Sequence, residues 1–216
     1  MSSEILVRLN ALSCTDLSDA MDRLVIPGQC LGIMPLDRRF RLVGQAFTLL
    51  YGPADGTAGS VGDYIDELGS GQVAVLDAQG RTDATCWGDL LTSTAWHRQV
   101  AGTVIDGVCR DFDRSIELNY PIFSRGNWMR TGKDRLQLVA RQVPITIGGV
   151  IVAPGDWLRG DGDGVVSMPA ARIDEILDMA EEVRAAEDRI RAAIDAGVPL
   201  HQARAEQGYF TLQSRR

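Results

Sequence analysis

The sequence predicts an α/β domain whose sheet carries mixed or antiparallel additions. Two short apolar runs, 72–77 and 102–106, have the composition of buried strands, and each is followed after a loop by a helical pattern. A β-rich region then extends from 135 to 167, and apolar residues at helical spacing run from 170 to about 196. A pure doubly wound sheet would alternate strands and helices throughout, so this order of elements indicates a mixed sheet.

Each expected element rests on a local pattern. Apolar residues at helical spacing predict helices, alternation predicts strands, and Gly, Pro and Asp pairs predict turns. The first half is expected to contain a helix over 4–12, a helix capped by Thr15 and ended by Pro27-Gly28, strands within 40–51, a functional loop over 52–59, a helix capped by Ser60 and reaching about Leu68, a strand over 72–77 and a loop over 79–83.

The second half is expected to alternate briefly between strand and helix before the β-rich region. The expected elements are a helix over 90–98, a strand over 102–106 closed by Asp106-Gly107, a helix from Asp111 to about Asn119, strands over 121–124, 136–140, 145–147 and 150–152, strands over 157–158 and 165–167, and helices over 170–196 and 200–206. Gly148-Gly149 is a hairpin signal between two of these strands.

Length and charge limit the possible classes of protein. The 216 residues, 45% of them hydrophobic, are enough for a single domain over 1–216 with a sizeable core, in which 170–216 form a helical extension. The net charge of −7 argues against a nucleic-acid partner, which requires a basic surface. No basic N-terminal region followed by an apolar run is visible, and no stretch approaches the roughly 20 apolar residues of a membrane helix. We therefore expect a cytoplasmic protein without a membrane partner.

Several common site motifs are missing from the sequence. The four cysteines form no Cys-x-x-Cys pair, so free thiols are expected rather than a zinc ribbon. His97 and His201 share no ligand-like spacing. The run 160–164, Gly-Asp-Gly-Asp-Gly, resembles the start of a calcium loop, but Arg172 stands where such a loop needs its final glutamate. A tight turn is the better interpretation of that run.

Three charged residues form the candidate site. Arg110 and Asp111 follow the expected strand 102–106, and ligands collect beyond the carboxyl ends of strands in open α/β sheets. Asp89 opens the expected helix over 90–98, whose first N–H groups have no partner within the helix. A helix start, a fixed cation and two carboxylates could thus bind an anionic substrate and a hard metal ion. The alternative is that Asp89 and Asp111 only cap helices, where acids are favoured by the dipole.

The spacing Asp89, twenty residues, Arg110-Asp111 resembles the signature of a known family. This family is the class II pyruvate aldolases acting on 4-hydroxy-4-methyl-2-oxoglutarate and 4-carboxy-4-hydroxy-2-oxoadipate, whose relatives include the regulator of ribonuclease E activity A. The similar segments are 20–24, 61–64, 87–91, 102–107, 130–132, 148–156 and 163–166. The resemblance implies a swivelling β/β/α fold assembled as a homotrimer or homohexamer, with the extension 170–216 packed on a neighbouring subunit.

The resemblance also implies metal ligands. Asp111 matches the metal-binding carboxylate, and Glu187 is the best match for a glutamate that the family contributes from an adjacent subunit's terminal helix. Oxygen ligands of this kind suit Mg²⁺ or Mn²⁺ rather than Zn²⁺.

The remaining site residues are carried over in the same way. Asp89 matches the acid that orients metal-bound water, and Arg110 matches the arginine that holds the substrate and the developing enolate. Leu90 and Leu91, with Gly88 beside them, match the backbone groups that hold the pyruvyl carboxylate.

The expected function is therefore a metal-dependent aldolase that cleaves a 4-hydroxy-2-oxo acid to pyruvate and a second keto acid, as in the degradation of aromatic compounds. Oxaloacetate decarboxylation is the expected side activity because it shares the enolate. Lys133 is the only lysine, and its surroundings look solvated, which disfavours a Schiff-base aldolase. Arg81 is a candidate for holding a second substrate carboxylate. The alternative function is a non-catalytic protein-binding regulator; methyl transfer is disfavoured because no glycine-rich loop follows the first strand.

Overall fold

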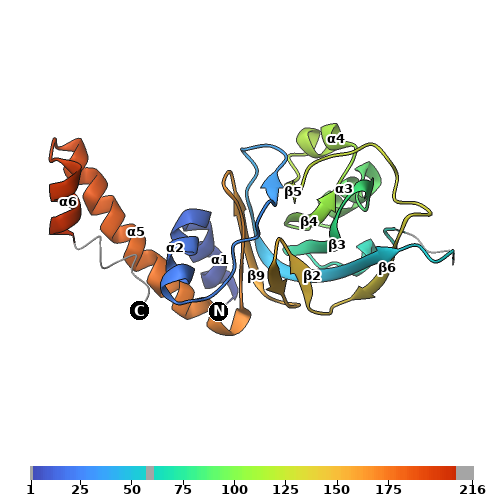
Figure 1. The fold of residues 1–216 in the computed structure, drawn as a ribbon, viewed down its shortest axis with the longest axis horizontal. Helices are drawn as coiled ribbons and strands as arrows, with labels where there is room; N and C mark the ends of the chain where they lie inside the picture. The colour runs from blue at the N-terminus through green and yellow to red at the C-terminus, as the bar shows by residue number, and fades with distance from the viewer. Residues whose placement is uncertain (1, 57–60, 208–216) are drawn as a thin grey trace. The chain divides into compact units, whose positions relative to one another are not determined.

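The structure, a computed structural model, describes residues 2–56 and 61–207. It contains two compact units (Figure 1). The sheet unit spans Gln29–Ala170, and the helical unit combines the residues up to Gly28 with those from Ala171 onward. The C-terminal helices thus group with the N-terminal ones. Packing of 170–216 on a neighbouring subunit stays a prediction.

The sheet unit is built on one mixed eight-stranded sheet. Its strand order is β1-β5-β4-β3-β2-β9-β10, and β6 also pairs with β2. The four strands β2, β3, β4 and β5 are parallel to their neighbours within this group, and all other pairs are antiparallel. The strands are β1 (Met34–Pro35), β2 (Leu42–Pro53), β3 (Gln72–Thr85), β4 (Gly102–Val108), β5 (Ile122–Ser124), β6 (Leu136–Arg141), β9 (Trp157–Asp161) and β10 (Gly164–Met168). The expected mixed α/β sheet is confirmed.

The sheet curves almost to closure. Gln29, in the segment that leads to β1, bridges to Val166 of β10 at the other end of the strand order. The Cys30 N–H also donates to the Val165 carbonyl at 3.0 Å. A barrel-like sheet of this kind protects its end strands from pairing with other chains.

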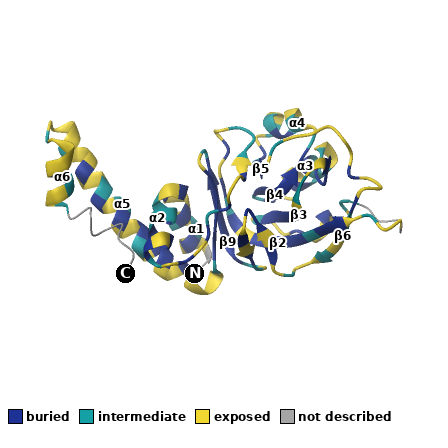
Figure 2. Cartoon of the chain, in the orientation of Figure 1, coloured by how far each residue is buried: buried dark blue, intermediate teal, exposed yellow. Residues whose placement is uncertain are grey.

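Successive side chains along a strand point to opposite faces of the sheet. Because the successive residues 73–76 of β3 are apolar, both faces of the sheet are covered by a hydrophobic core. In β3, Ala74 and Leu76 belong to the core beneath α3 (Asp89–His97), whereas Val73 and Val75 belong to the core on the opposite face. Figure 2 shows β3 and β4 buried along most of their length. Two short helical elements, η1 (Ile65–Glu67) and α4 (Phe112–Glu117), complete the sheet unit together with the hairpin described next.

Two buried carboxylates hold the hairpin of β7 (Ile145–Ile147) and β8 (Val150–Val152). Asp77 accepts a hydrogen bond from the Thr146 N–H at 3.0 Å, and Asp106 accepts one from the Gly148 N–H at 2.6 Å. Asp106 is also ion-paired with Arg125, with Oδ1 2.5 Å from Nε. Gly148 and Gly149 both have positive φ, as the predicted hairpin turn requires.

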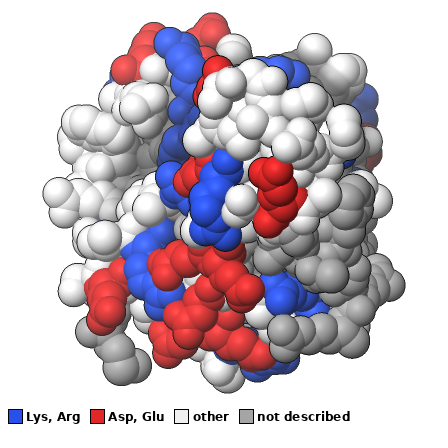
Figure 3. Space-filling view, turned by 90° about the vertical axis from the view of Figure 1, so that its left-hand side faces the viewer, with Lys and Arg blue, Asp and Glu red and all other residues white. Residues whose placement is uncertain are grey.

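The helical unit is assembled on α5 (Ile173–Asp195), which buries one face. Apolar side chains at three- and four-residue spacing point inward, as amphipathicity predicts. Acidic side chains of the unit gather beside arginines on the face in Figure 3; Arg8, for example, contacts Asp178 and Glu181 at 2.6 and 2.7 Å. The helical elements are α1 (Ser2–Ala11), α2 (Cys14–Arg23), η2 (Ala170–Arg172), α5 (Ile173–Asp195) and α6 (Leu200–Glu206).

The cap of the second helix differs from the prediction. Ser13, not Thr15, is the N-cap of α2. Its hydroxyl accepts from the Asp16 N–H at 3.1 Å, while the Asp16 carboxylate accepts from the Ser13 N–H at 2.8 Å. This reciprocal pair satisfies two N–H groups at once, which a hydroxyl at Thr15 could not do.

The middle of the chain also differs from the prediction. The expected loop 79–83 lies inside β3, which continues to Thr85 through two register shifts, and Gln79 and Gly80 have positive φ at the irregularity. Asp106-Gly107, expected to close a strand, is still paired within β4. Of the expected loop 52–59 and the cap Ser60, residues 57–60 lie outside the described residues. The short helix expected up to Leu68 is η1 alone. Across the described ranges, no helix combines the length and apolar character that a membrane span needs.

Candidate active site

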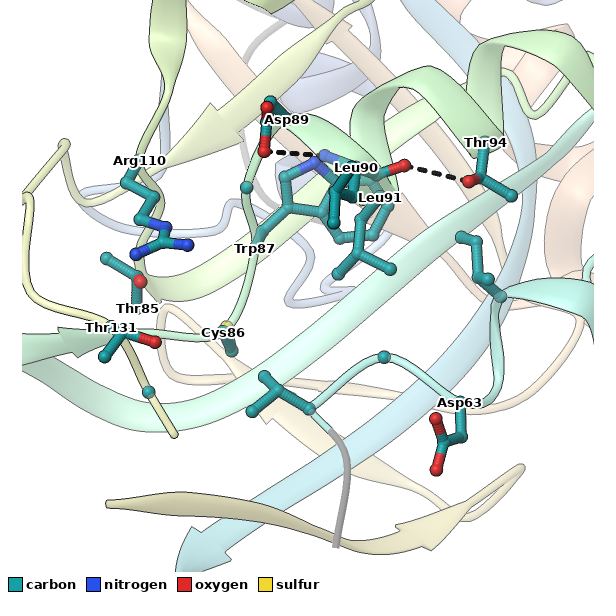
Figure 4. Close-up of a pocket in the computed structure, with 15 residues that line it drawn as sticks. Asp63, Thr85, Cys86, Trp87, Asp89, Leu90, Leu91, Thr94, Arg110 and Thr131 are labelled. Atoms are coloured by element: carbon teal, nitrogen blue, oxygen red, sulfur yellow. Dashed lines mark hydrogen bonds between the residues drawn. The ribbon is translucent and has the colours of Figure 1, made fainter. Parts of the chain in front are cut away.

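A cavity of about 380 Å³ lies beyond the carboxyl ends of β3 and β4 in the sheet unit (Figure 4). This is the edge at which the sequence predicts the site. Figure 4 shows the Arg110 guanidinium on one side of the cavity and the start of α3 along its upper edge. The described lining residues are Val61, Gly62, Asp63, Ile65, Thr85, Cys86, Trp87, Gly88, Asp89, Leu90, Leu91, Thr94, Arg110, Thr131 and Gly132.

Carboxylates occupy the N–H groups at the start of α3. The Asp89 N–H donates to Asp111 Oδ2 at 3.2 Å, and the Leu90 N–H donates to Asp89 Oδ1 at 2.8 Å. These amides are among the donors left without helical partners at an N-terminus, and they attract anions. The observed occupants are acids of the chain itself, which shows that the position suits a carboxylate.

Arg110 and Asp111 are adjacent in space as well as in sequence. Arg110 Nε lies 3.2 Å from Asp111 Oδ2, and both side chains are about two-fifths exposed, at 38% and 40%. The Arg110 N–H donates to the Trp87 carbonyl at 3.0 Å, which ties the end of β4 to the segment after β3. Asp111 has φ of 57°, a left-handed conformation that few residues other than Gly, Asn and Asp adopt. It is the N-cap of α4 without a side-chain capping bond, so simple capping does not explain this residue.

Trp87 anchors the wall from which α3 starts. Its indole N–H donates to Thr92 Oγ1 at 2.9 Å, and that hydroxyl donates to the Gly88 carbonyl at 3.1 Å. The ring is stacked parallel to Tyr120, with 6.3 Å between centroids. A fixed helix start is what the site needs in order to hold its N–H groups in one direction.

Asp89, which lines the cavity, and Asp111 beside it suit a hydrated cation better than a caged one. Asp89 and Asp111 are both exposed and share the start of α3. No group of three metal-ligating side chains is present among residues 2–56 and 61–207. Mg²⁺ is commonly bound through one or two carboxylates, with water and substrate oxygens completing its coordination. The donor set therefore fits Mg²⁺ or Mn²⁺ held together with a substrate, and it does not fit a structural zinc site.

Glu187, the other expected metal ligand, belongs to α5 in the helical unit. It is half-buried, and Arg191 Nη2 lies 4.0 Å from its carboxylate. Burial, and next the charges of Asp19 and Asp16, raise the pKa of Glu187. Its contribution to a neighbouring subunit's site stays a prediction.

Some lining residues were missed from the sequence. Asp63, Thr85 and Thr131 were not among the expected site residues, although Asp63 and Thr131 lie in two of the segments that carry the family resemblance. Arg81, expected as a partner for a second carboxylate, is ion-paired with Asp83 at 2.5 Å and lines a different cavity. The four cysteines are free, as expected, and all four are buried. Burial raises the pKa of the Cys86 thiol in the cavity wall.

Comparison with known proteins gives a consistent picture. A family model described as "RraA-like: Aldolase/RraA" matches residues 14–167. "Protein DlpA" of Legionella pneumophila is 38% identical over 208 residues, which are 95% of this chain but 34% of that protein, so the chain spans about a third of its length. A protein of Halalkalibacterium halodurans named "Putative 4-hydroxy-4-methyl-2-oxoglutarate aldolase" is 32% identical over 94% of this chain and 95% of its own.

Solved structures share the fold. An uncharacterized protein from Pseudomonas syringae pv. tomato str. DC3000 aligns with a TM-score of 0.88 and 42% identity, over 94% of this chain and 97% of that one. Streptomyces coelicolor RraAS2, described as an unusual member of the RNase ES inhibitor RraA protein family, aligns with a TM-score of 0.82 and 30% identity, over 88% and 97%. The fold class expected from the sequence resemblance is thereby confirmed.

Proposed function

Because the chain belongs to the RraA-like (Aldolase/RraA) family, we propose that it is a divalent-metal-dependent aldolase. It cleaves a 4-hydroxy-2-oxo acid to pyruvate and a second carbonyl compound, and it decarboxylates oxaloacetate as a side activity. The observation that carries the proposal is the placement of Arg110 in a cavity beside the carboxylate-binding start of α3, with Asp89 and Asp111 next to it.

The backbone at the start of α3 positions the substrate. The carboxylate of the pyruvyl half binds the amides of Leu90 and Leu91, and Gly88 leaves room for it. To reach the Leu90 N–H it displaces Asp89 Oδ1, which now accepts that bond. The displaced Asp89 carboxylate is then free to act on the substrate as a base.

The chemistry requires two proton transfers and one stabilised charge. Asp89 accepts the proton of the C4 hydroxyl, directly or through a water molecule, and the C4–O bond becomes a carbonyl as the C3–C4 bond breaks. The electron pair of that bond forms the enolate of pyruvate, which then takes up at C3 the proton that Asp89, or the water molecule beside it, removed from the hydroxyl. Arg110 places fixed positive charge where the enolate oxygen develops, a contribution of roughly 3–4 kcal/mol by analogy with oxyanion-hole donors.

Asp111, and Glu187 from a neighbouring subunit, are the residues that would hold the cation. When bound, Mg²⁺ or Mn²⁺ supplies Lewis-acid stabilisation of the same developing charge. A site completed by a second chain requires an oligomer, and we propose a homotrimer or homohexamer. Light scattering of the purified protein measures this assembly directly.

The test is a coupled assay of pyruvate release in Mg²⁺. The panel contains 4-hydroxy-2-oxo acids, including 4-hydroxy-4-methyl-2-oxoglutarate and 4-carboxy-4-hydroxy-2-oxoadipate, together with oxaloacetate. Activity is expected to disappear in excess chelator and to return with Mg²⁺ or Mn²⁺. Full activity in chelator would exclude the metal. No activity on any member, together with capture of an RNA-degrading complex in a pull-down, would instead establish a protein-binding regulator.

A further inference from the structure

The positive and negative side chains of the cavity lie at different places in its wall. Arg110 is the only cationic side chain among its described lining residues, whereas Asp63 and Asp89 are acidic. Figure 4 shows Asp63 across the cavity from Arg110 and from the start of α3. Among the described residues no hydrogen-bond or ion-pair partner of the Asp63 carboxylate is found, and the residue is exposed. A substrate that extends from Arg110 toward the far side therefore meets an unpaired negative charge.

Among the described residues, no cationic side chain is ion-paired with Asp63; Arg98, which contacts the same segment, is paired with Asp66 at 3.5 Å. Arg81, the candidate for a second carboxylate, is ion-paired with Asp83 and also donates to the Arg135 carbonyl at 3.0 Å. It lines a different cavity. The four residues that precede Val61 are Thr, Ala, Gly and Ser, which carry no charge whatever their position. A second substrate carboxylate at the far end would therefore face Asp63 without a counter-charge, which is unfavourable in a partly enclosed cavity.

The polar side chains on the side of the cavity away from Arg110 present hydrogen-bond acceptors rather than free donors. Thr94, which Figure 4 places on the same side as Asp63, already donates its hydroxyl proton to the Leu90 carbonyl at 2.8 Å. Its oxygen is left with lone pairs, and the Asp63 carboxylate can only accept while it is ionised. The cavity lining also includes the apolar side chains of Val61, Ile65 and Leu91. A substrate hydroxyl can donate to these oxygens, whereas a substrate carboxylate cannot.

Building on the proposed aldolase function, we propose that Asp63 determines which substrates the site accepts. It favours 4-hydroxy-2-oxo acids with a single carboxylate and an uncharged, hydroxyl-bearing far end over those with a second carboxylate. The cavity of about 380 Å³ has room for several carbons beyond a pyruvyl group. The class of substrate is thus a hydroxylated 2-oxo monocarboxylic acid, whose cleavage gives pyruvate and a hydroxyaldehyde.

The test uses two substrates that differ at one group. 4,5-Dihydroxy-2-oxopentanoate and 4-hydroxy-2-oxoglutarate have the same length and differ in carrying CH₂OH or COO⁻ at C5. The wild-type kcat/KM is expected to be about tenfold higher for the first, which corresponds to about 1.4 kcal/mol. Asp63→Asn should remove most of this preference by raising kcat/KM for the dicarboxylate, 4-hydroxy-2-oxoglutarate. Asp66→Asn, a matched change in the same segment outside the cavity, should retain it.

Ionic strength separates a charge effect from a structural one. The wild-type preference should shrink when salt is raised to about 0.5 M because exposed charges are screened, whereas that of Asp63→Asn should not change. Oxaloacetate decarboxylation should change much less than cleavage of 4-hydroxy-2-oxoglutarate when Asp63 is replaced, since the second carboxylate of oxaloacetate is the leaving group beside C3. A wild-type preference for the dicarboxylate, or an unchanged ratio in Asp63→Asn, would overturn the inference.

Binding tests the inference apart from turnover. 5-Hydroxy-2-oxopentanoate and 2-oxoglutarate carry the same two end groups but lack the hydroxyl needed for cleavage. Calorimetry should show tighter binding of the first to the wild type and near-equal binding to Asp63→Asn. If this holds while no panel member releases pyruvate, the proposed aldolase reaction is wrong and the role of Asp63 stands. If pyruvate is released but Asp63→Asn leaves both preferences intact, only the role of Asp63 is wrong.

Discussion

A side chain at Gly88 would collide with Asp111. A Cβ at Gly88 would lie 2.8 Å from Asp111 Oδ2 and 3.3 Å from Arg110 Nε. Because Gly88 has no side chain, the start of α3, the Arg110 guanidinium and the Asp111 carboxylate can approach one another closely. Because both neighbours are exposed side chains, they can move aside without disturbing the core.

Gly88→Ala should therefore damage the site and spare the fold. A displacement of about 1 Å in positioning groups can cost roughly 100-fold in rate, so we expect pyruvate release to fall by one to two orders of magnitude. The melting temperature should change by no more than a few degrees. Gly69→Ala is the matched control because its new Cβ would meet Gln72 at an ordinary 3.5 Å. Wild-type turnover in Gly88→Ala would mean that Asp111 and Arg110 do not act together.

Arg110→Ala should lower kcat by about 10²–10³, the loss seen when a donor to a developing oxyanion is removed. Asp111→Asn should lower kcat by a similar factor because it weakens the hold on the cation that stabilises the same charge. Asparagine is chosen because it also tolerates the left-handed conformation of Asp111, so the change removes charge without adding strain. Arg114→Ala and Asp113→Asn, on the neighbouring helix α4, serve as controls and should retain activity. Retained turnover in either site variant would show that its residue is misassigned.

Glu187→Gln should raise the melting temperature at pH 7.5. Burial raises the pKa of Glu187, so the folded protein binds this proton more tightly than the unfolded chain does. The ionised carboxylate thus destabilises the fold at neutral pH. That penalty disappears as pH falls through the raised pKa, so the advantage of the variant should vanish in acid. Thermal melts between pH 7.5 and 4 measure this.

Glu175→Gln, on the same helix, should change the melting temperature in the opposite direction. The side-chain hydrogen bond from Arg172 lowers the pKa of Glu175, whose ionised form therefore stabilises the fold above its unfolded pKa. Removing it should lower the melting temperature slightly at neutral pH, and the loss should fade as pH falls through the lowered pKa. If Glu187 is also the ligand donated to a neighbouring site, Glu187→Gln will lose activity while gaining stability, whereas Glu175→Gln will keep its activity.

Asp106→Asn should destabilise the sheet unit. Asp106 is 4% exposed and accepts hydrogen bonds from Arg125 and the Gly148 N–H. Removing one member of a buried pair typically costs 3–5 kcal/mol, and because Arg125 is partly exposed we expect about 2–3 kcal/mol in urea unfolding. Asp83→Asn, which breaks the exposed pair with Arg81, should cost less than about 1 kcal/mol. Equal effects would contradict the role of Asp106 in holding the hairpin.

Local patterns in the sequence predict most of the fold. The helix over 90–98, the Gly148-Gly149 hairpin and the terminal helices are found because periodicity and glycine pairs act over a few residues. The continuation of β3 through 79–83 is not predictable in this way. Its pairing with β4 is restored after two irregularities, and the polar Gln79-Gly80 step looks like a turn in the sequence although the partner strand keeps it in the sheet.

The site is predictable in its centre and not at its edges. Arg110 and Asp89 follow from the position of strand ends and helix starts, and both line the cavity. Asp63 lies in the segment 61–64, which shares the family resemblance, but no local pattern places its side chain in the same cavity as Arg110 and Asp89. Its place in the wall follows only from the three-dimensional arrangement of distant segments.

Trp87 gives the cavity an optical reporter. It is the only one of the four tryptophans among the described lining residues, and its ring is fixed against Tyr120. Because only this indole lines the cavity, a bound acid is expected to change its surroundings more than those of the other three. Intrinsic emission can therefore follow occupancy at equilibrium, and affinities can be compared even in variants that have lost all turnover.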